Sequence, residues 1–164
     1  KRPQSRSTMV YEVQYRGIYG IIRLNMSTRA KIRFVEREEG VTFSEHPGVD
    51  KTQIEIYKHY DGYPSGLGVN LAKFLDEFTV VDGLGQDNYK IANGLGCLAA
   101  QYVEAFKQVP GDIYLQKPND SMDDCDYCYY VWVTEDKSIW ISIFDYDDCI
   151  FVGKPDKLQT KYEE

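Results

Sequence analysis

Two spacings of apolar residues predict strands and helices along this chain. Apolar and polar residues alternate over 29–34 and 54–59, which is the pattern of a strand with one buried face. Residues 9–25 begin with the same alternation and contain two glycines, so they are predicted to form a strand or a hairpin. The remaining strand-like segments all follow the middle of the chain; they are 112–116, 127–134, 138–144 and 149–153.

The middle of the chain shows helical spacing instead. One apolar stripe runs from Leu67 to Phe78, and a second runs from Ile91 to Phe106 before a proline–glycine pair that ends the helix. Both stripes are interpreted as core-facing. Strands, two helices and then strands predict an α+β fold: a mainly antiparallel sheet with the two amphipathic helices packed on one face, as a two-layer sandwich.

The last two long strands are predicted to form a hairpin whose register follows from its apolar residues. Pairing Val131 with Ile141 and Val133 with Ile139 places all four on the core face, and it leaves 135–137 as the loop. The same register gathers aromatic side chains on the opposite face, namely Tyr130, Trp132, Trp140 and Phe144. Such a face needs a cover, which is either another element of this chain, such as its N-terminal segment, or a partner or second subunit.

Charge is distributed unevenly over the 164 residues, whose net charge is −7. Residues 1–40 carry a net +5, and residues 41–164 carry a net −12. Because most of the chain is acidic, direct binding of nucleic acid is not expected. The acidic residues nearest the open end of the predicted hairpin are Asp120, Asp123, Asp124, Asp126, Asp145, Asp147 and Asp148.

Carboxylates gathered in this way repel one another unless water, a cation or a basic partner screens them. The first interpretation is a solvated acidic rim. A Ca²⁺ or Mg²⁺ site is an alternative, although the spacing differs from that of an EF-hand loop. A basic partner surface is another, and it would be recognised by Asp123, Asp124, Asp147 and Asp148 together with the four aromatic residues of the hairpin.

Three of the four cysteines lie at the same end of the hairpin. Cys125 and Cys128 have the C-x₂-C spacing of zinc and redox sites, and Cys149 could complete a set with one carboxylate. A second matching pair is missing from the sequence, so buried or unreactive thiols are favoured over a zinc site. No cofactor is therefore predicted, with zinc as the alternative.

Catalytic motifs are also missing from the sequence. It contains no G-x-S-x-G elbow, no H-E-x-x-H and no P-loop, and its only histidines are His46, in a charged loop, and His59. A non-enzymatic function is therefore favoured. No apolar run is long enough for a membrane helix, and four cysteines do not form the framework of a small secreted scaffold. We expect an acidic, soluble, cytoplasmic protein.

The most distinctive stretch is the turn HYDGYPSGLG, which joins the strand at 54–59 to the first helix. Its turn-forming residues and a serine able to cap a helix suffice to explain a purely structural corner. An anion site is the alternative, because a helix start rich in glycine exposes free N–H groups at the positive end of its dipole. Pairing Phe34 with Ile54 would add Arg29 beside His59. The candidate ligand-binding residues are Arg29, His59, Asp61, Tyr63, Ser65, Gly66 and Gly68.

This turn also carries a family resemblance. Ser27-Thr28-Arg29 at the start of a strand, and the later H-(aromatic)-D-G-Y-P-x-G-x-G corner, resemble a group of small uncharacterised proteins of bacteriophages, bacteria and archaea. The likeness spans about 26–153 and is most specific at the corner. Members of the group often have Trp at the position of Tyr60, and they lack the three hairpin cysteines.

The resemblance implies a viral or mobile-element origin and brings no known activity. It also places the usual start of the family at Met26. Residues 1–25 are therefore expected to be an N-terminal extension or an added strand or hairpin, followed by a single α+β domain over 26–164.

Two functions are open at this point. The favoured one is a non-enzymatic accessory protein that acts on a host protein in the host cytoplasm, through an acidic surface rich in aromatic residues, with self-association as a further possibility. The alternative is a small enzyme or sensor that binds a phosphate-bearing, nucleotide-like ligand at the corner of Arg29 and His59.

Overall fold

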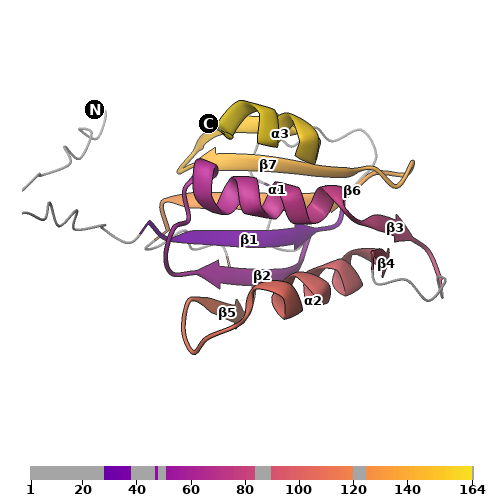
Figure 1. The fold of residues 1–164 in the computed structure, drawn as a ribbon, viewed down its shortest axis with the longest axis horizontal. Helices are drawn as coiled ribbons and strands as arrows, with labels where there is room; N and C mark the ends of the chain where they lie inside the picture. The colour runs from indigo at the N-terminus through magenta and orange to yellow at the C-terminus, as the bar shows by residue number, and fades with distance from the viewer. Residues whose placement is uncertain (1–27, 38–46, 48–50, 84–89, 120–124, 164) are drawn as a thin grey trace, which may run out of the picture.

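The computed structural model describes residues 28–37, 47, 51–83, 90–119 and 125–163. Figure 1 shows the elements that these residues form. The strands are β1 (Ala30–Val35), β2 (Thr52–Lys58), β3 (Thr79–Val81), β4 (Ile91–Asn93), β5 (Ile113–Gln116), β6 (Tyr127–Val133), β7 (Ile139–Asp145) and β8 (Asp148–Gly153). The helices are a five-residue π-helical turn, η2 (Pro64–Gly68), and three α-helices, α1 (Val69–Asp76), α2 (Gly94–Phe106) and α3 (Pro155–Tyr162).

Six strands form the main sheet, in the order β5-β2-β1-β6-β7-β8. The central pair, β1 and β6, is parallel, and the other neighbours are antiparallel. A separate two-stranded parallel sheet joins β3 and β4. With its helices and its mostly antiparallel sheet, the chain has the predicted α+β fold.

Both predicted registers are confirmed. In the first strand pair, Phe34 lies opposite Ile54 and Arg33 lies opposite Glu55. In the hairpin, Val131 pairs with Ile141, as Val133 does with Ile139. Burial of one face of each strand explains this agreement, because a shift of one residue would turn every apolar side chain to the other face.

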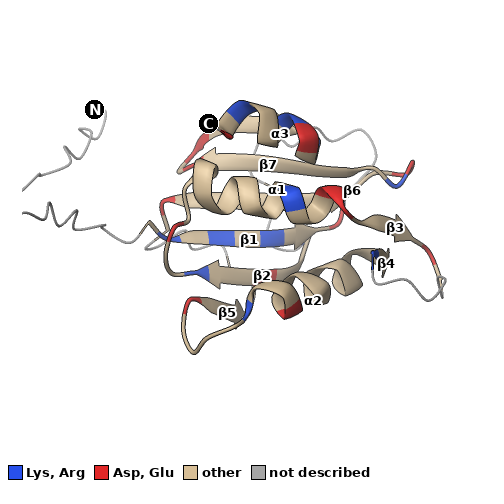
Figure 2. Cartoon of the chain, in the orientation of Figure 1, with Lys and Arg blue, Asp and Glu red and all other residues tan. Residues whose placement is uncertain are grey.

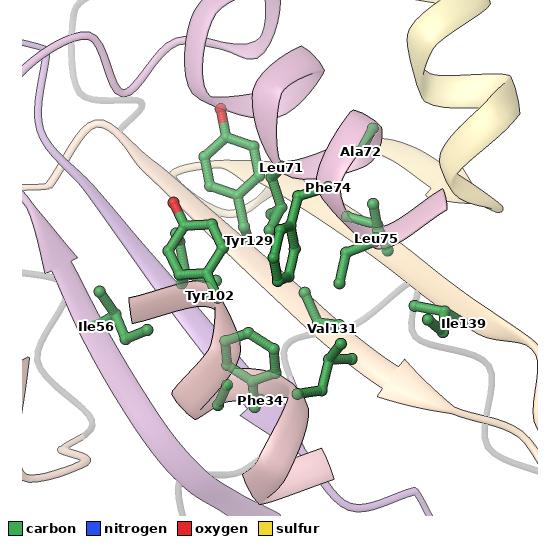
Figure 3. Close-up of a cluster of buried hydrophobic side chains, with 14 of the residues drawn as sticks. Phe34, Ile56, Leu71, Ala72, Phe74, Leu75, Tyr102, Tyr129, Val131 and Ile139 are labelled. Atoms are coloured by element: carbon green, nitrogen blue, oxygen red, sulfur yellow. The ribbon is translucent and has the colours of Figure 1, made fainter. Parts of the chain in front are cut away.

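The helices pack against one face of the sheet and enclose the main core (Figure 3). From the helices, the core takes Leu71, Ala72, Phe74 and Leu75 of α1 and Leu98, Ala99 and Tyr102 of α2. From the sheet, it takes side chains that alternate along β1, β2, β6 and β7, among them Phe34, Ile56, Tyr129, Val131 and Ile139. The two apolar stripes therefore supply core residues as predicted.

Three elements differ from the sequence prediction. Ile91 belongs to β4, so α2 begins only at Gly94. The small sheet of β3 and β4 was not predicted. Helix α3 was not predicted either. Its Pro155 lies in the first turn, where the missing N–H costs nothing, and its Leu158 is fully buried. The strand or hairpin predicted within 9–25, and with it the extension 1–25, lies outside the described residues.

Candidate functional site

The corner between β2 and η2 is held tightly against the start of β1. Asp61 has a positive φ of 53°, which turns the chain. The N–H of Gly62 then donates to the carbonyl of Thr28 at 2.9 Å, and the hydroxyl of Tyr129 donates to the carbonyl of Gly62 at 2.7 Å. A Cβ on Gly62 would lie 2.7 Å from that of Ala30. Only glycine fits here, and the reason is packing.

The amides at the helix start are already hydrogen-bonded. The N–H groups of Gly66 and Gly68 donate to the carbonyl of Tyr63 at 3.0 and 3.4 Å, and that of Leu67 donates to the carbonyl of Asp61 at 3.1 Å. The prediction of free N–H groups is therefore wrong at these three residues. Gly66 has a packing reason of its own, because a Cβ there would lie 2.6 Å from the ring of Tyr63.

Side chains of the predicted anion site lie around this corner without forming a closed set. Asp61, Tyr63 and Ser65 are exposed. The Nδ1 atom of His59 lies 2.8 Å from the hydroxyl of Tyr57, and its backbone N–H donates to the carbonyl of Asp112.

Arg29 lies just outside the β1–β2 ladder, whose last pair is Ala30 with Lys58. Its backbone N–H donates to the carboxylate of Asp126 at 2.9 Å. The confirmed register brings Arg29 and His59 to the same end of the sheet. The hydrogen bond of Arg29 described above goes to Asp126, and those of His59 go to Tyr57 and Asp112. The anion site stays a prediction, without the N–H groups of Gly66, Leu67 and Gly68 as donors.

The aromatic face of the hairpin is buried in the isolated chain. Tyr130, Trp132 and Phe144 are at most 2% exposed, and only Trp140 is partly exposed. The two tryptophan rings stack at 6.2 Å between centroids, and Tyr130 meets Phe144 edge to face at 5.5 Å. The aromatic half of the predicted partner surface is thus corrected, because three of its four side chains are part of the interior.

Strand β7 separates two of the hairpin cysteines, Cys128 and Cys149. Cys128 and Cys149 lie on β6 and β8, and each pairs with Phe144 on the strand between them. Burial raises the pKa of Cys125 and of Cys128 to about 11, so both thiols are protonated at neutral pH. Among the described residues, no group of three His, Cys, Asp or Glu side chains is arranged to hold a metal ion.

Acidic residues do gather at the predicted end of the hairpin. Asp145 and Asp148 face each other where β7 turns into β8. Burial, followed by the nearby carboxylates of Asp148 and Asp126, raises the pKa of Asp145. Tyr146 at the turn is exposed, as is Asp147. Asp120, Asp123 and Asp124 lie outside the described residues.

A buried ionic cluster lies on the same face as the aromatic residues. Lys31 and Arg33 on β1 and Glu55 on β2 are charged, yet they are only 4%, 3% and 0% exposed. Figure 2 shows blue bands on β1, which lies inside the main sheet. The carboxylate of Glu55 receives the Nε of Arg33 at 2.8 Å and lies 3.2 Å from the Nζ of Lys31. The predicted pairing of Phe34 with Ile54 implies that Arg33 faces Glu55, and the structure adds that both side chains are buried.

Arg33 extends this cluster across the parallel junction of the sheet. Its Nη1 donates to the hydroxyl of Tyr130 on β6 at 3.1 Å, and its Nη2 donates to the carbonyl of Asn119 at 2.6 Å. The Nζ of Lys31 donates to the side-chain oxygen of Asn119 at 3.2 Å. One guanidinium thus joins β1, β2, β6 and the segment after β5, which is a structural role.

An open groove lies between α1 and α2, with a volume of about 630 Å³. Phenylalanine rings form its apolar part: the ring of Phe74 lies 4.5 Å from that of Phe78 and 5.7 Å from that of Phe106, centroid to centroid. Phe78 and Phe106 are only partly buried. The other lining residues are Asn70, Lys73, Glu77, Lys90, Gln101, Glu104 and Ala105.

Sequence reasoning missed this groove. Phe78 and Phe106 end the two apolar stripes, and a stripe shows which side of a helix is apolar without showing whether a neighbour covers its full length. An available signal was the presence of charged residues close to these phenylalanines along the chain, namely Lys73, Glu77 and Glu104.

Comparisons with models of protein families, with curated proteins and with solved structures found no match for this chain. Within the described ranges, none of the helices has the length and apolar character needed to cross a membrane.

Proposed function

We propose that this chain is a non-enzymatic binding protein and that it binds a partner protein in the groove between α1 and α2. The observation that carries the proposal is the open set of phenylalanine rings bordered by charged side chains. Partly exposed aromatic rings inside a polar rim are typical of protein-binding surfaces. The volume also lies in the range of about 300–1,000 Å³ found for ligand sites.

The chemistry of the groove favours binding over bond breaking. Among the described residues that line it, none is a histidine, cysteine or serine. Its Glu77 is paired with Lys90. Elsewhere, the raised pKa values of Cys125 and Cys128 leave little thiolate to act as a nucleophile at neutral pH.

The acidic end of the hairpin supports a partner with a basic surface. Burial is the main cause of the raised pKa of Asp145, and the nearby carboxylates of Asp148 and Asp126 add to it; a basic partner would offset the repulsion among these three carboxylates. The viral or mobile-element origin implied by the resemblance fits an accessory protein that acts on a host protein. A viral or mobile-element origin, action on a host protein and a location in the host cytoplasm are therefore proposed together with the binding function.

The alternative, a phosphate-bearing ligand at the corner, is supported by Arg29 and His59 at one end of the sheet. Thermal unfolding in the presence of inorganic phosphate tests it. A rise in melting temperature that is lost in both Arg29→Ala and His59→Ala would favour this alternative over the groove.

Photo-cross-linking tests the groove directly. A photoreactive phenylalanine analogue at Asn70, on the groove wall, should capture a host protein that the same analogue at the exposed Thr160 does not capture. The capture should disappear when Phe78→Ser is added. Equal capture from both positions, or capture that survives Phe78→Ser, would contradict the proposal.

A further inference from the structure

The two outer strands of the main sheet differ in how far their free edges are blocked. β8 is irregular where it pairs with β7, and the Nζ of Lys161 donates to the carbonyl of Ile150 at 2.8 Å. A bulge and a lysine are common devices that prevent an edge strand from pairing with another chain. β5, at the other edge, is regular and carries no charged side chain over Ile113–Gln116.

The orientation of β5 shows which of its backbone groups face outward. His59 donates its N–H to the carbonyl of Asp112. In an antiparallel pair every second residue points its N–H and C=O at the neighbouring strand, so Tyr114, two residues after Asp112, also turns its backbone groups toward β2. The groups of Ile113 and Leu115 therefore face away from the sheet. The carbonyl of Ile113 accepts the Nζ of Lys107 at 2.8 Å, and its N–H donates to Gly111.

Leu115 is the residue of this edge whose outward backbone groups are available to another chain. Within the described part of the chain, its outward N–H and C=O have no hydrogen-bond partner, and its side chain is 67% exposed. Tyr114 beside it is 47% exposed. A residue with one free donor and one free acceptor can pair with the same residue of a second chain. If a two-fold axis passes beside it, the N–H of each copy donates to the C=O of the other copy, so all four groups are hydrogen-bonded.

We propose that β5 pairs with β5 of a second copy of this chain, antiparallel and with a two-fold axis at Leu115. Each Leu115 then donates its N–H to the carbonyl of its copy, and the two exposed leucine side chains meet. Tyr114 of one copy faces Gln116 of the other, and Ile113 faces Lys117. Like charges directly opposite each other would destabilise such a contact, and no charged residue of the strand lies opposite its own copy.

The short strand predicts a weak, reversible dimer, since four residues bury less area than a stable interface needs. Each copy carries a net charge of −7, so their repulsion should be screened as salt is added. Dimerisation should therefore strengthen with ionic strength. Binding of a basic partner at the acidic end should weaken instead, which separates the two interactions. This dimer does not depend on the proposed function of the groove.

Sedimentation velocity over a range of protein concentrations tests the dimer. Leu115→Lys and Leu115→Pro should each weaken it by at least about tenfold. Proline at this position removes only an outward N–H, so the monomer should keep its melting temperature. Val152→Lys, on the exposed part of β8, is the matched control and should leave the dimer unchanged.

A disulfide trap fixes the register. Directly opposed hydrogen-bonded residues have Cα atoms about 5.5 Å apart, which suits a disulfide. Leu115→Cys should therefore form a cross-linked dimer on mild oxidation, well above the background of the wild type and of Gln116→Cys. The proposal is overturned by a chain that stays monomeric up to about millimolar concentration. A dimer that survives Leu115→Lys, or equal cross-linking by the two cysteine variants, would overturn it as well.

Discussion

The aromatic face of the hairpin and the α1–α2 groove both present clusters of aromatic rings, and they differ in exposure. On the hairpin, Tyr130, Trp132 and Phe144 are buried and packed beside an ionic cluster. In the groove, Phe78 and Phe106 remain partly exposed at the ends of stripes that otherwise form the core. Aromatic content alone does not separate a buried face from an open one, because the two clusters differ only in how far their rings are covered.

The largest effect is expected from breaking the ionic cluster beside the buried face. Arg33→Ala leaves Glu55 and the hydroxyl of Tyr130 without the guanidinium, and it should lower the free energy of unfolding by about 3–5 kcal/mol. Lys73→Ala removes an exposed pair with Glu163 and should cost less than about 1 kcal/mol. Denaturant titration measures both. Similar costs would mean that the cluster is hydrated in solution.

Replacing one aromatic residue of the buried hairpin face and one of the groove by alanine tests how far the two clusters differ in burial. Trp132→Ala empties a buried site and should cost about 3–5 kcal/mol. Phe78→Ala removes a ring that is already partly in water and should cost about 1–2 kcal/mol. The same titrations compare them, and equal costs would contradict the assignment of one ring to the interior and the other to a surface.

The thiols of the buried face should make stability depend on pH. Burial raises the pKa of Cys125 and Cys128 from 9.0 to about 11, so the folded chain holds these protons after the unfolded chain has released them. The contribution of these two thiols to the free energy of unfolding should therefore be constant below about pH 9 and fall as the pH rises toward 11. Cys128→Ala should flatten this decline. An identical decline in the variant would show that other groups cause it.

The smallest effect is expected at the acidic end. Because the pKa of Asp145 is raised, its charged form is disfavoured in the folded chain. Asp145→Asn should therefore raise the free energy of unfolding at pH 7, by less than about 1 kcal/mol. Glu104→Gln, an exposed change on α2, should alter it less. A loss of stability in Asp145→Asn would instead indicate that this carboxylate holds a partner or a cation.

Local patterns predicted much of the fold. The registers of β1 with β2 and of β6 with β7 followed from alternation, because one face of each strand is buried. The parallel pairing of β1 with β6 was not predicted, since it joins segments almost 100 residues apart that carry no local signal of their pairing. Helix α3 was missed because only Pro155 and Leu158 of its short, polar sequence are buried.

Glycines explain why the corner was harder to interpret. In the sequence, Gly66 and Gly68 are equally compatible with free amides for an anion and with close packing. The structure shows their amides bonded to Tyr63, and the ring of Tyr63 occupies the space where a side chain of Gly66 would lie. A choice between the two explanations depends on contacts that no spacing of residues encodes.

An amide NMR titration with indole as an apolar aromatic probe tests the central claim most directly. The signals that move should be those of the two groove walls, 70–78 on α1 and just after it and 101–106 on α2. Phe78→Ser should abolish the shifts while the spectrum elsewhere stays that of the folded chain. Shifts confined to the hairpin or to the corner, or none at any accessible indole concentration, would contradict the assignment of the groove as the binding surface.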